Sequence, residues 1–144
     1  MIQRVQTLYL IFAGIISLGL IFVFSLWTNT QGVEIFALSL FNEGLIFLKV
    51  IPILFVLSGF LSLMSIFLFK NRKNQFVLNR INILINLILL GVLIYHLLML
   101  SGETQVSEKG IGVFLPVVVI VLLAIANKAI KKDEDLVKSV DRLR

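Results

Sequence analysis

The residues that could carry chemistry in this sequence are few, and three of them are predicted to lie close together. Lys49, Tyr95 and His96, the only histidine, each stand near one end of a long apolar segment. An ionisable group inside a membrane is costly and is therefore a hypothesis for a functional site. The three side chains could line one shallow outer pocket, joined by Glu43 or Glu103 from the loops. We favour a simpler interpretation, in which Lys49 reaches the lipid headgroups and His96 makes a hydrogen bond between helices.

The remaining inventory of reactive groups is poor. The chain has no cysteine, one histidine and no acidic residue inside its apolar segments. It also has no glycine-rich phosphate loop and no spacing typical of metal ligands. The sequence therefore predicts no catalytic, cofactor-binding or metal-binding residues, no cofactor and no enzymatic activity.

Composition indicates the environment in which these residues are held. Of the 144 residues 59% are hydrophobic and 15% are charged, and the mean hydropathy is +1.06. Soluble domains are roughly 45–50% apolar and about 25% charged. These values exclude a water-soluble enzyme, a disordered tail and a disulfide-built secreted module.

The apolar residues form long runs without charges, separated by short charged clusters. Each run has about the 20 residues that a helix needs to cross the hydrocarbon layer. The runs are continuous and do not alternate with polar residues, which favours helices over a β-barrel. The prediction is an all-α membrane protein, a four-transmembrane-helix bundle in a single membrane domain of residues 1–144. Its spans are residues 7–27, 50–69, 81–100 and 111–130.

The basic residues predict the orientation, because short cytoplasmic loops are enriched in lysine and arginine. Eleven of the 13 basic residues fall on one face, in the N-terminus, the second link and the tail. The other face keeps only Lys49 and Lys109. Both termini are therefore predicted to be cytoplasmic. Every basic cluster adjoins a span end, so attraction to lipid headgroups accounts for it and no nucleic-acid partner is predicted.

Prolines and aromatic residues agree with these spans. Pro52 and Pro116 are predicted to lie in the first turn of a helix, where a missing N–H costs little. Tyr9, Trp27 and Tyr95 fall near span ends, which suits a ring with a polar tip at the headgroup boundary.

The two outer loops differ in character. Residues 28–49 are apolar in part and are predicted to form a short element in the outer interface. Either a short helix or a pair of strands fits this segment, and a docking surface for an extracytoplasmic partner is the functional alternative. The third loop is predicted to be a plain turn, with Gly102, Gly110 and Gly112 as breakers.

Small and polar residues recur at helical spacing inside the spans. Asn82 and Asn86 share one face and are predicted to give packing specificity through hydrogen bonds between helices. Ser58, Ser62 and Ser65 in the second span, and Ala13 and Ser17 in the first, are predicted to meet inside the bundle, because small residues let helices approach closely.

The tail, residues 131–144, is predicted to form a helical cytoplasmic C-terminal extension. Leu136, Val137, Val140 and Leu143 make an apolar stripe at helical spacing. The extension either continues the fourth helix or turns to lie along the membrane surface.

Four segments carry a resemblance to a known family: MIQRVQTLYL, FLFKNRKNQ, INILINL and ANKAIKKDEDLVKSVDRLR. Together they resemble an uncharacterised domain-of-unknown-function family of small four-helix integral membrane proteins of the Bacteroidota. The resemblance covers nearly the whole chain. It implies four spans in an inner membrane and no established activity.

The segments most typical of that family fall on the predicted cytoplasmic face, which favours an interaction surface there. Its basic members are Arg4, Arg72 and Lys73. Its acidic members, which these could neutralise across the helix ends, are Asp133, Glu134 and Asp135.

Two functions fit the sequence. The first is a non-enzymatic accessory or scaffold subunit of a membrane complex, with the lipid bilayer and a membrane-protein partner as its contacts. The alternative is a small transporter or channel that self-associates as a homo-oligomer, with Lys49 and His96 at its outer mouth.

Overall fold

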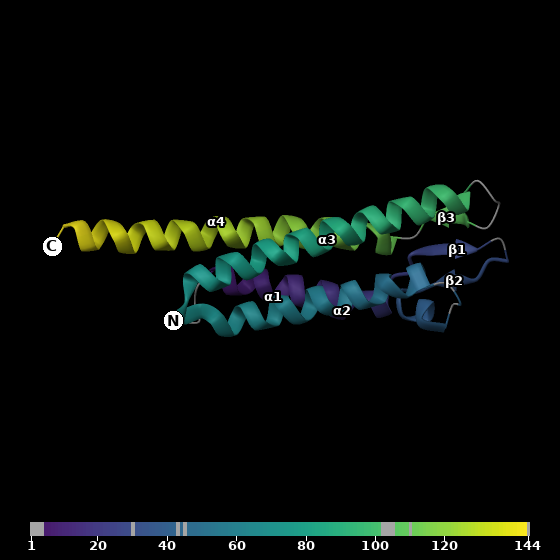
Figure 1. The fold of residues 1–144 in the computed structure, drawn as a ribbon, viewed down its shortest axis with the longest axis horizontal. Helices are drawn as coiled ribbons and strands as arrows, with labels where there is room; N and C mark the ends of the chain where they lie inside the picture. The colour runs from purple at the N-terminus through teal and green to yellow at the C-terminus, as the bar shows by residue number, and fades with distance from the viewer. Residues whose placement is uncertain are drawn as a thin grey trace.

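Four long helices make up most of the chain in the computed structural model, which describes residues 5–29, 31–42, 44, 46–101, 106–109 and 111–143 (Figure 1). All four are long and apolar enough to cross a membrane, so the chain is an all-α membrane protein. The helices are α1 (Val5–Leu18), α2 (Ile46–Phe67), α3 (Arg72–Ser101) and α4 (Leu115–Arg142). A 3-10 turn, η1 (Leu20–Phe22), follows α1.

The helices form a four-membered ring with alternating directions. Helix α1 packs against α2 and α4, and α3 packs against the same two helices. The start of α1, the α2–α3 link and the end of α4 lie at one end of the bundle (Figure 1). We call this the basic end, because it carries Lys70 of the link, Arg72 and Lys73 at the start of α3, and Lys128, Lys131 and Lys132 of α4. The opposite end is called the sheet end.

The α2–α3 link is shorter than the sequence suggested. A 3-10 turn, η3 (Leu68–Lys70), follows α2, and Asn71 caps α3. The Asn71 side-chain oxygen accepts from the Asn74 N–H at 3.4 Å, and its carbonyl accepts from the Gln75 N–H at 3.0 Å. An N-cap asparagine satisfies donors that a helix start otherwise leaves open. Residues 72–80, predicted to be link, are therefore helical.

The two prolines behave differently. Pro116 lies in the first turn of α4, as predicted. Pro52 lies inside α2, because that helix begins at Ile46, four residues before the predicted span; its assignment to the first turn was wrong. Its missing N–H leaves the Leu48 carbonyl without its helical donor.

A small antiparallel sheet closes the other end of the bundle. Its strands are β1 (Trp27–Asn29), β2 (Glu34–Ile35) and β3 (Val106–Lys109), in the order β2-β1-β3. Trp27 pairs with Ile35 on one side and with Lys109 on the other. Gly32, at φ 77°, makes the turn between β1 and β2 in a conformation that favours glycine. The prediction of a plain turn for the third loop was wrong, because β3 comes from that loop.

Residues 28–49 hold both of the structures that the sequence left open. Strands β1 and β2 are followed by a 3-10 helix, η2 (Leu38–Asn42). Gly112, predicted to be a breaker, lies in another 3-10 helix, η4 (Ile111–Phe114), where its N–H donates to the Ser25 carbonyl at 3.0 Å. Gly102 and Gly110 lie outside the described residues.

The apolar core is largest beneath this sheet. Trp27 is 3% exposed and packs with Leu26, Leu40 and Phe55. Its ring is therefore covered by protein, and its depth at the headgroup boundary stays a prediction. A second, smaller cluster lies between α1 and α4 and contains Leu10, Ala13, Val119, Leu123 and Ala126.

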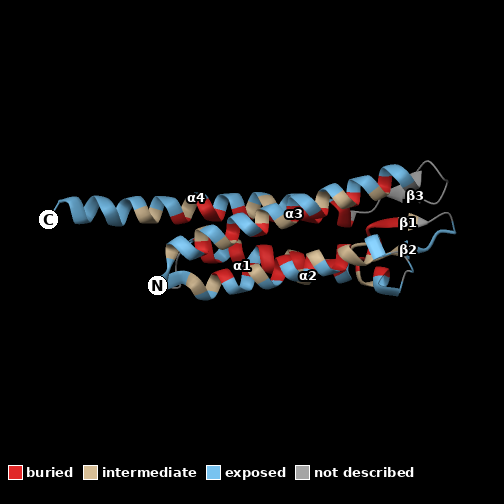
Figure 2. Cartoon of the chain, in the orientation of Figure 1, coloured by how far each residue is buried: buried red, intermediate tan, exposed pale blue. Residues whose placement is uncertain are grey.

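Exposed residues cover the outer surface of the bundle (Figure 2). Many of them are large and apolar, as expected for helices that face lipid. Helix α4 continues past the other helices as one element, with its last turns exposed (Figures 1 and 2). Of the two alternatives for the tail, the continued helix is therefore the one found.

Candidate functional site

One face of α3 is polar and buried inside the bundle. Gln75, Asn79, Asn82 and Asn86 follow one another at intervals of four, three and four residues, which places them on one helix face, and all are at most 1% exposed. We call them the amide stripe. They face α2, whose serine stripe consists of the fully buried Ser58, Ser62 and Ser65.

The two stripes are joined midway along the bundle. The Asn82 amide donates to the Ser58 carbonyl at 3.0 Å and to the Ser62 hydroxyl at 2.8 Å. The Asn86 amide donates to the Ser58 hydroxyl at 2.7 Å. Buried polar groups need such partners, and the need is greatest where no water is present. The predicted role of Asn82 and Asn86 in bonding to neighbouring helices therefore has a geometric basis.

Nearer the basic end the network reaches all four helices. The Ser65 hydroxyl donates to the Asn79 side-chain oxygen at 2.7 Å, and the Asn79 amide donates to Asn127 of α4 at 3.0 Å. Gln75 donates to the Ser65 carbonyl at 2.9 Å and accepts from Gln6 of α1 at 3.4 Å. Each helix thus contributes at least one amide or hydroxyl to the same buried system.

Small residues allow α1 and α2 to approach closely beside this network. The Ser17 and Ser58 hydroxyl oxygens are 3.3 Å apart. Gly59 lies so close to Leu18 that an added Cβ would come within 2.7 Å of its Cδ2 atom. The predicted meeting of the small-residue faces of the first two helices is confirmed by these contacts.

One acceptor of the network is left over. The Asn86 side-chain oxygen is buried and has no hydrogen-bond partner within the described part of the chain. Its amide nitrogen has more acceptors than hydrogens, since it lies within bonding distance of the Ser58 hydroxyl and of the Asn82 carbonyl and side-chain oxygens. Two amide hydrogens cannot serve three acceptors fully.

The side chains of this network are suited to hold the helices in place and not to carry out a reaction. Amides and hydroxyls stay neutral over the ordinary pH range and have no neighbouring base that would activate them. Within the described residues no three His, Cys, Asp or Glu side chains are placed to hold a metal ion. What the arrangement can do is fix the register and rotation of the four helices.

The predicted outer pocket residues lie at the sheet end. The His96 ring makes an edge contact with Tyr95, with ring centroids 5.8 Å apart, and bonds to the backbone of Phe47 at the start of α2. Lys49 lies two residues further along α2 and is half-buried. Tyr95 is 58% exposed and faces outward. The contact of His96 with α2 matches the favoured interpretation of a bond between helices, while a shared pocket stays a prediction.

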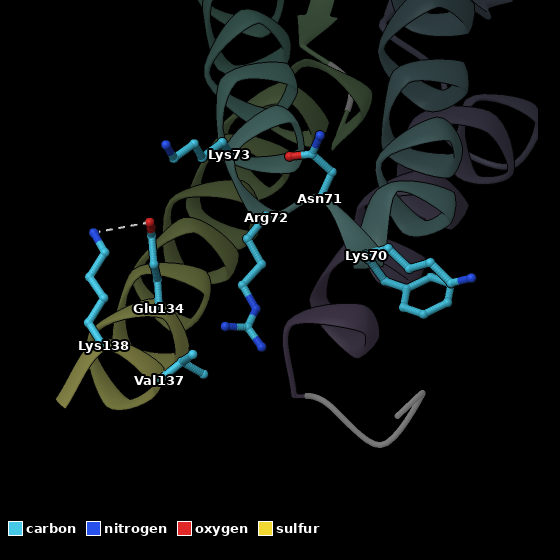
Figure 3. Close-up of a pocket in the computed structure, with 8 residues that line it drawn as sticks. Lys70, Asn71, Arg72, Lys73, Glu134, Val137 and Lys138 are labelled. Carbon is cyan, nitrogen blue, oxygen red and sulfur yellow. Dashed lines mark ion pairs between the residues drawn. The ribbon is translucent and has the colours of Figure 1, made fainter. Parts of the chain in front are cut away.

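At the basic end, one groove is lined by three of the predicted surface residues, Arg72, Lys73 and Glu134. This groove of about 620 Å³ lies between residues 69–73, which form the α2–α3 link and the first two residues of α3, and three residues of α4, Glu134, Val137 and Lys138. We call it the basic groove (Figure 3). Arg72 and Lys73 come from its link side. The ion pair drawn there joins Glu134 to Lys138 at 3.2 Å, within α4.

The other predicted members of the surface lie elsewhere. Asp133 borders a second depression, between α1 and α4, together with Gln6 and Lys132. Asp135 borders a third depression on α4 itself. Arg4 lies outside the described residues. The five described residues therefore border three separate depressions, and an interaction role for those around the basic groove stays a prediction.

Four members of the buried network were missed by sequence reasoning: Gln6, Gln75, Asn79 and Asn127. Gln75 and Asn79 were assigned to a link, and Asn127 was treated as the end of a span. The repeat of amides at positions 75, 79, 82 and 86 was the signal that could have found two of them, since it continues the face of Asn82 and Asn86 backward by two turns.

No curated protein and no solved structure matches the chain. Residues 2–143 match a family described as a domain of unknown function, DUF4293. This match spans nearly the whole sequence and agrees with the resemblance noted from its segments. The chain therefore belongs to the DUF4293 family.

Proposed function

We propose that the protein is a non-enzymatic accessory or scaffold subunit of a membrane complex, in a bacterial inner membrane with both ends in the cytoplasm. The distribution of charge supports this orientation. Basic residues of the link and of α4 gather at one end of the bundle, and the cytoplasmic side of inner-membrane proteins is the one enriched in lysine and arginine.

The observation that carries the proposal is the length of α4. This helix has 28 residues, which corresponds to about 42 Å, and its last turns project beyond the other three helices (Figure 1). The projecting part is amphipathic: Leu136, Val137 and Val140 are 45–58% exposed on a helix otherwise rich in charges. A rigid helix with an open apolar stripe suits a helix-in-groove or helix-pair contact with a partner protein.

The buried network supports the same role from inside the bundle. Neutral amides and serines from every helix hold the bundle in one arrangement, so α4 leaves the membrane in a fixed direction. A fixed direction is what a scaffold needs in order to hold a partner at a constant place relative to the membrane.

A photo-crosslinker placed on the two faces of the extension tests this proposal in native membranes. At Val140, on the apolar stripe, it is expected to capture one partner of defined size in stoichiometric yield. At Lys131, exposed on the same helix but outside the stripe, it serves as the matched control. Truncation after Lys132 should leave the bundle in the membrane and abolish copurification of that partner. Identical adducts from both faces, or none from Val140, would contradict the proposal.

A homo-oligomeric transporter is the second candidate, and the unpartnered Asn86 oxygen favours it. An open acceptor inside a polar helix face is a place where a permeating donor could bind. Reconstitution into liposomes distinguishes the two candidates. A homo-oligomer that conducts would support transport, and a sealed bundle would support the scaffold.

A further inference from the structure

The basic groove has a surplus of positive charge that its single carboxylate does not balance. Arg72 and Lys73 lie on the link side and Lys138 lies on the α4 side. Glu134 is the one acid of the lining, and its Oε1 already lies 3.2 Å from the Lys138 ammonium. In Figure 3 the Arg72 side chain extends between the link and α4, whereas Lys70 points away from α4. Arg72 is thus a cation whose side chain lies between the two walls of the groove.

The groove also lies where the apolar surface of the bundle gives way to a charged one. Phe67, near the end of α2, is 81% exposed on the lipid-facing surface, and the first charged residue after it is Lys70. Two apolar residues, Phe69 and Val137, belong to the groove lining itself. A ligand that fits this lining carries an anionic group next to an apolar one.

We propose that the basic groove binds the phosphate headgroup of an anionic phospholipid. Arg72 and Lys73 contact the phosphate oxygens, for which the planar guanidinium fork of arginine is well matched. Phe69 and Val137 lie against the glycerol and the first methylene groups. Basic pockets between membrane helices at the headgroup level are the usual sites for such lipids.

The lipid would act as a bridge between two parts of the chain that are distant in sequence. Its phosphate would join the α2–α3 link to the extension of α4, across which direct pairing of Arg72 with Glu134 had been predicted. Glu134 instead pairs with Lys138 within its own helix. The cations near the link are then available to a ligand.

The test uses the full-length protein in a neutral detergent. It would be titrated with dioctanoyl phosphatidylglycerol and, separately, with dioctanoyl phosphatidylcholine, and bound lipid would be counted by native mass spectrometry. The groove variant is Arg72→Gln with Lys73→Gln. The matched control is Lys131→Gln with Arg142→Gln, which removes the same charges from the same end but outside the groove lining.

One phosphatidylglycerol is expected per chain, with phosphatidylcholine bound far more weakly. Loss of each groove cation should weaken binding about fivefold, and loss of both about 25-fold. The control should change the affinity by less than about twofold, because Lys131 and Arg142 do not belong to the groove lining and exposed charges without direct contact are screened by water and salt. Glu134→Gln should tighten binding severalfold, a gain that a misfolded variant would not show.

Three results would overturn the proposal. The first is an equal loss of affinity in the groove variant and in the control. It would mean that the lipid is attracted to the positive charge of the whole basic end and not to a site in the groove. The second is equal binding of the two lipids. The third is full displacement of phosphatidylglycerol by millimolar inorganic phosphate at constant ionic strength, which would mean a site for the free anion.

Discussion

Replacing Asn82 with alanine is expected to destabilise the bundle more than the same change at Asn86. Both asparagines are fully or almost fully buried on the same face of α3, and both substitutions remove the same atoms. The cost of the cavity is therefore similar, and the difference between the two variants isolates the hydrogen bonds.

The bonds of the two residues are unequal. Asn82 donates to the Ser58 carbonyl and to the Ser62 hydroxyl of α2, and its side-chain oxygen accepts from Asn86. At about 0.6 kcal/mol for each side-chain bond in a membrane, Asn82→Ala loses about 2 kcal/mol. The Asn86 amide has three acceptors, the Ser58 hydroxyl and the carbonyl and side-chain oxygens of Asn82, but its two hydrogens make about two full bonds, worth about 1.2 kcal/mol, and its own side-chain oxygen is buried without a partner. Removing that oxygen offsets part of the loss, so Asn86→Ala should cost less than about 1 kcal/mol.

Unfolding in mixed micelles of dodecylmaltoside and sodium dodecyl sulfate measures both values. Far-UV circular dichroism follows the helices, and the fluorescence of Trp27, the single tryptophan, follows the sheet end. Coincident transitions from the two probes support a two-state analysis. Asn74→Ala, at an exposed position of the same helix, is the control and should change the free energy of unfolding by less than about 0.5 kcal/mol. The reasoning fails if Asn86→Ala costs as much as Asn82→Ala, or if Asn82→Ala matches the control.

Three further predictions concern other parts of the chain. Gly59→Ala should destabilise by about 1–3 kcal/mol, because the new Cβ would overlap the Leu18 side chain. Gly91→Ala, with nothing within 4 Å, should instead stabilise the bundle by up to about 1 kcal/mol in the same unfolding assay, because alanine is favoured over glycine in a helix. Trp27→Ala should cost about 3–5 kcal/mol, since the ring is 3% exposed in the core beneath the sheet; a loss below about 1 kcal/mol would contradict that packing. If the protein transports a solute through an outer mouth at His96, His96→Ala should remove any dependence of liposome flux on pH between about 5 and 8, and an unchanged pH profile would exclude that mouth.

The four helices could be predicted because their apolar runs are long and free of charge. Their ends could not be predicted in the same way. The start of α3 depends on the Asn71 cap. Residues 72–80, a segment rich in charged and polar side chains, therefore belong to the helix although they precede its apolar run. Hydropathy alone places such a segment in a loop.

The third strand of the sheet was missed for a different reason. Strand β3 has four residues and pairs with β1, about 80 residues earlier in the chain. So short a strand has no periodicity of its own, and its existence depends on the close approach of two loops at the end of the bundle. The burial of Trp27 follows from the same tertiary contact.

The candidate site was predicted in part. Asn82, Asn86 and the serine stripe were identified because amides and small residues at helical spacing stand out within an apolar span. Gln75 and Asn79 lie on the same face but outside the predicted span. The partner of Glu134 could not be predicted from sequence, because Lys138 at i+4 and the cations near the link carry the same charge. The structure shows that the ion pair is formed with Lys138.

Accessibility labelling tests the membrane topology most directly. The sequence has no cysteine, so every labelled thiol is an introduced one. Single cysteines would be placed at Asn42 in η2, at Lys73 at the start of α3 and at Ser139 in the α4 extension, all exposed positions. In intact spheroplasts an impermeant maleimide should label Asn42→Cys alone, and Lys73→Cys and Ser139→Cys should react only after permeabilisation. Labelling of Asn42→Cys and Ser139→Cys from the same side would contradict a chain that crosses the membrane four times with its basic end in the cytoplasm.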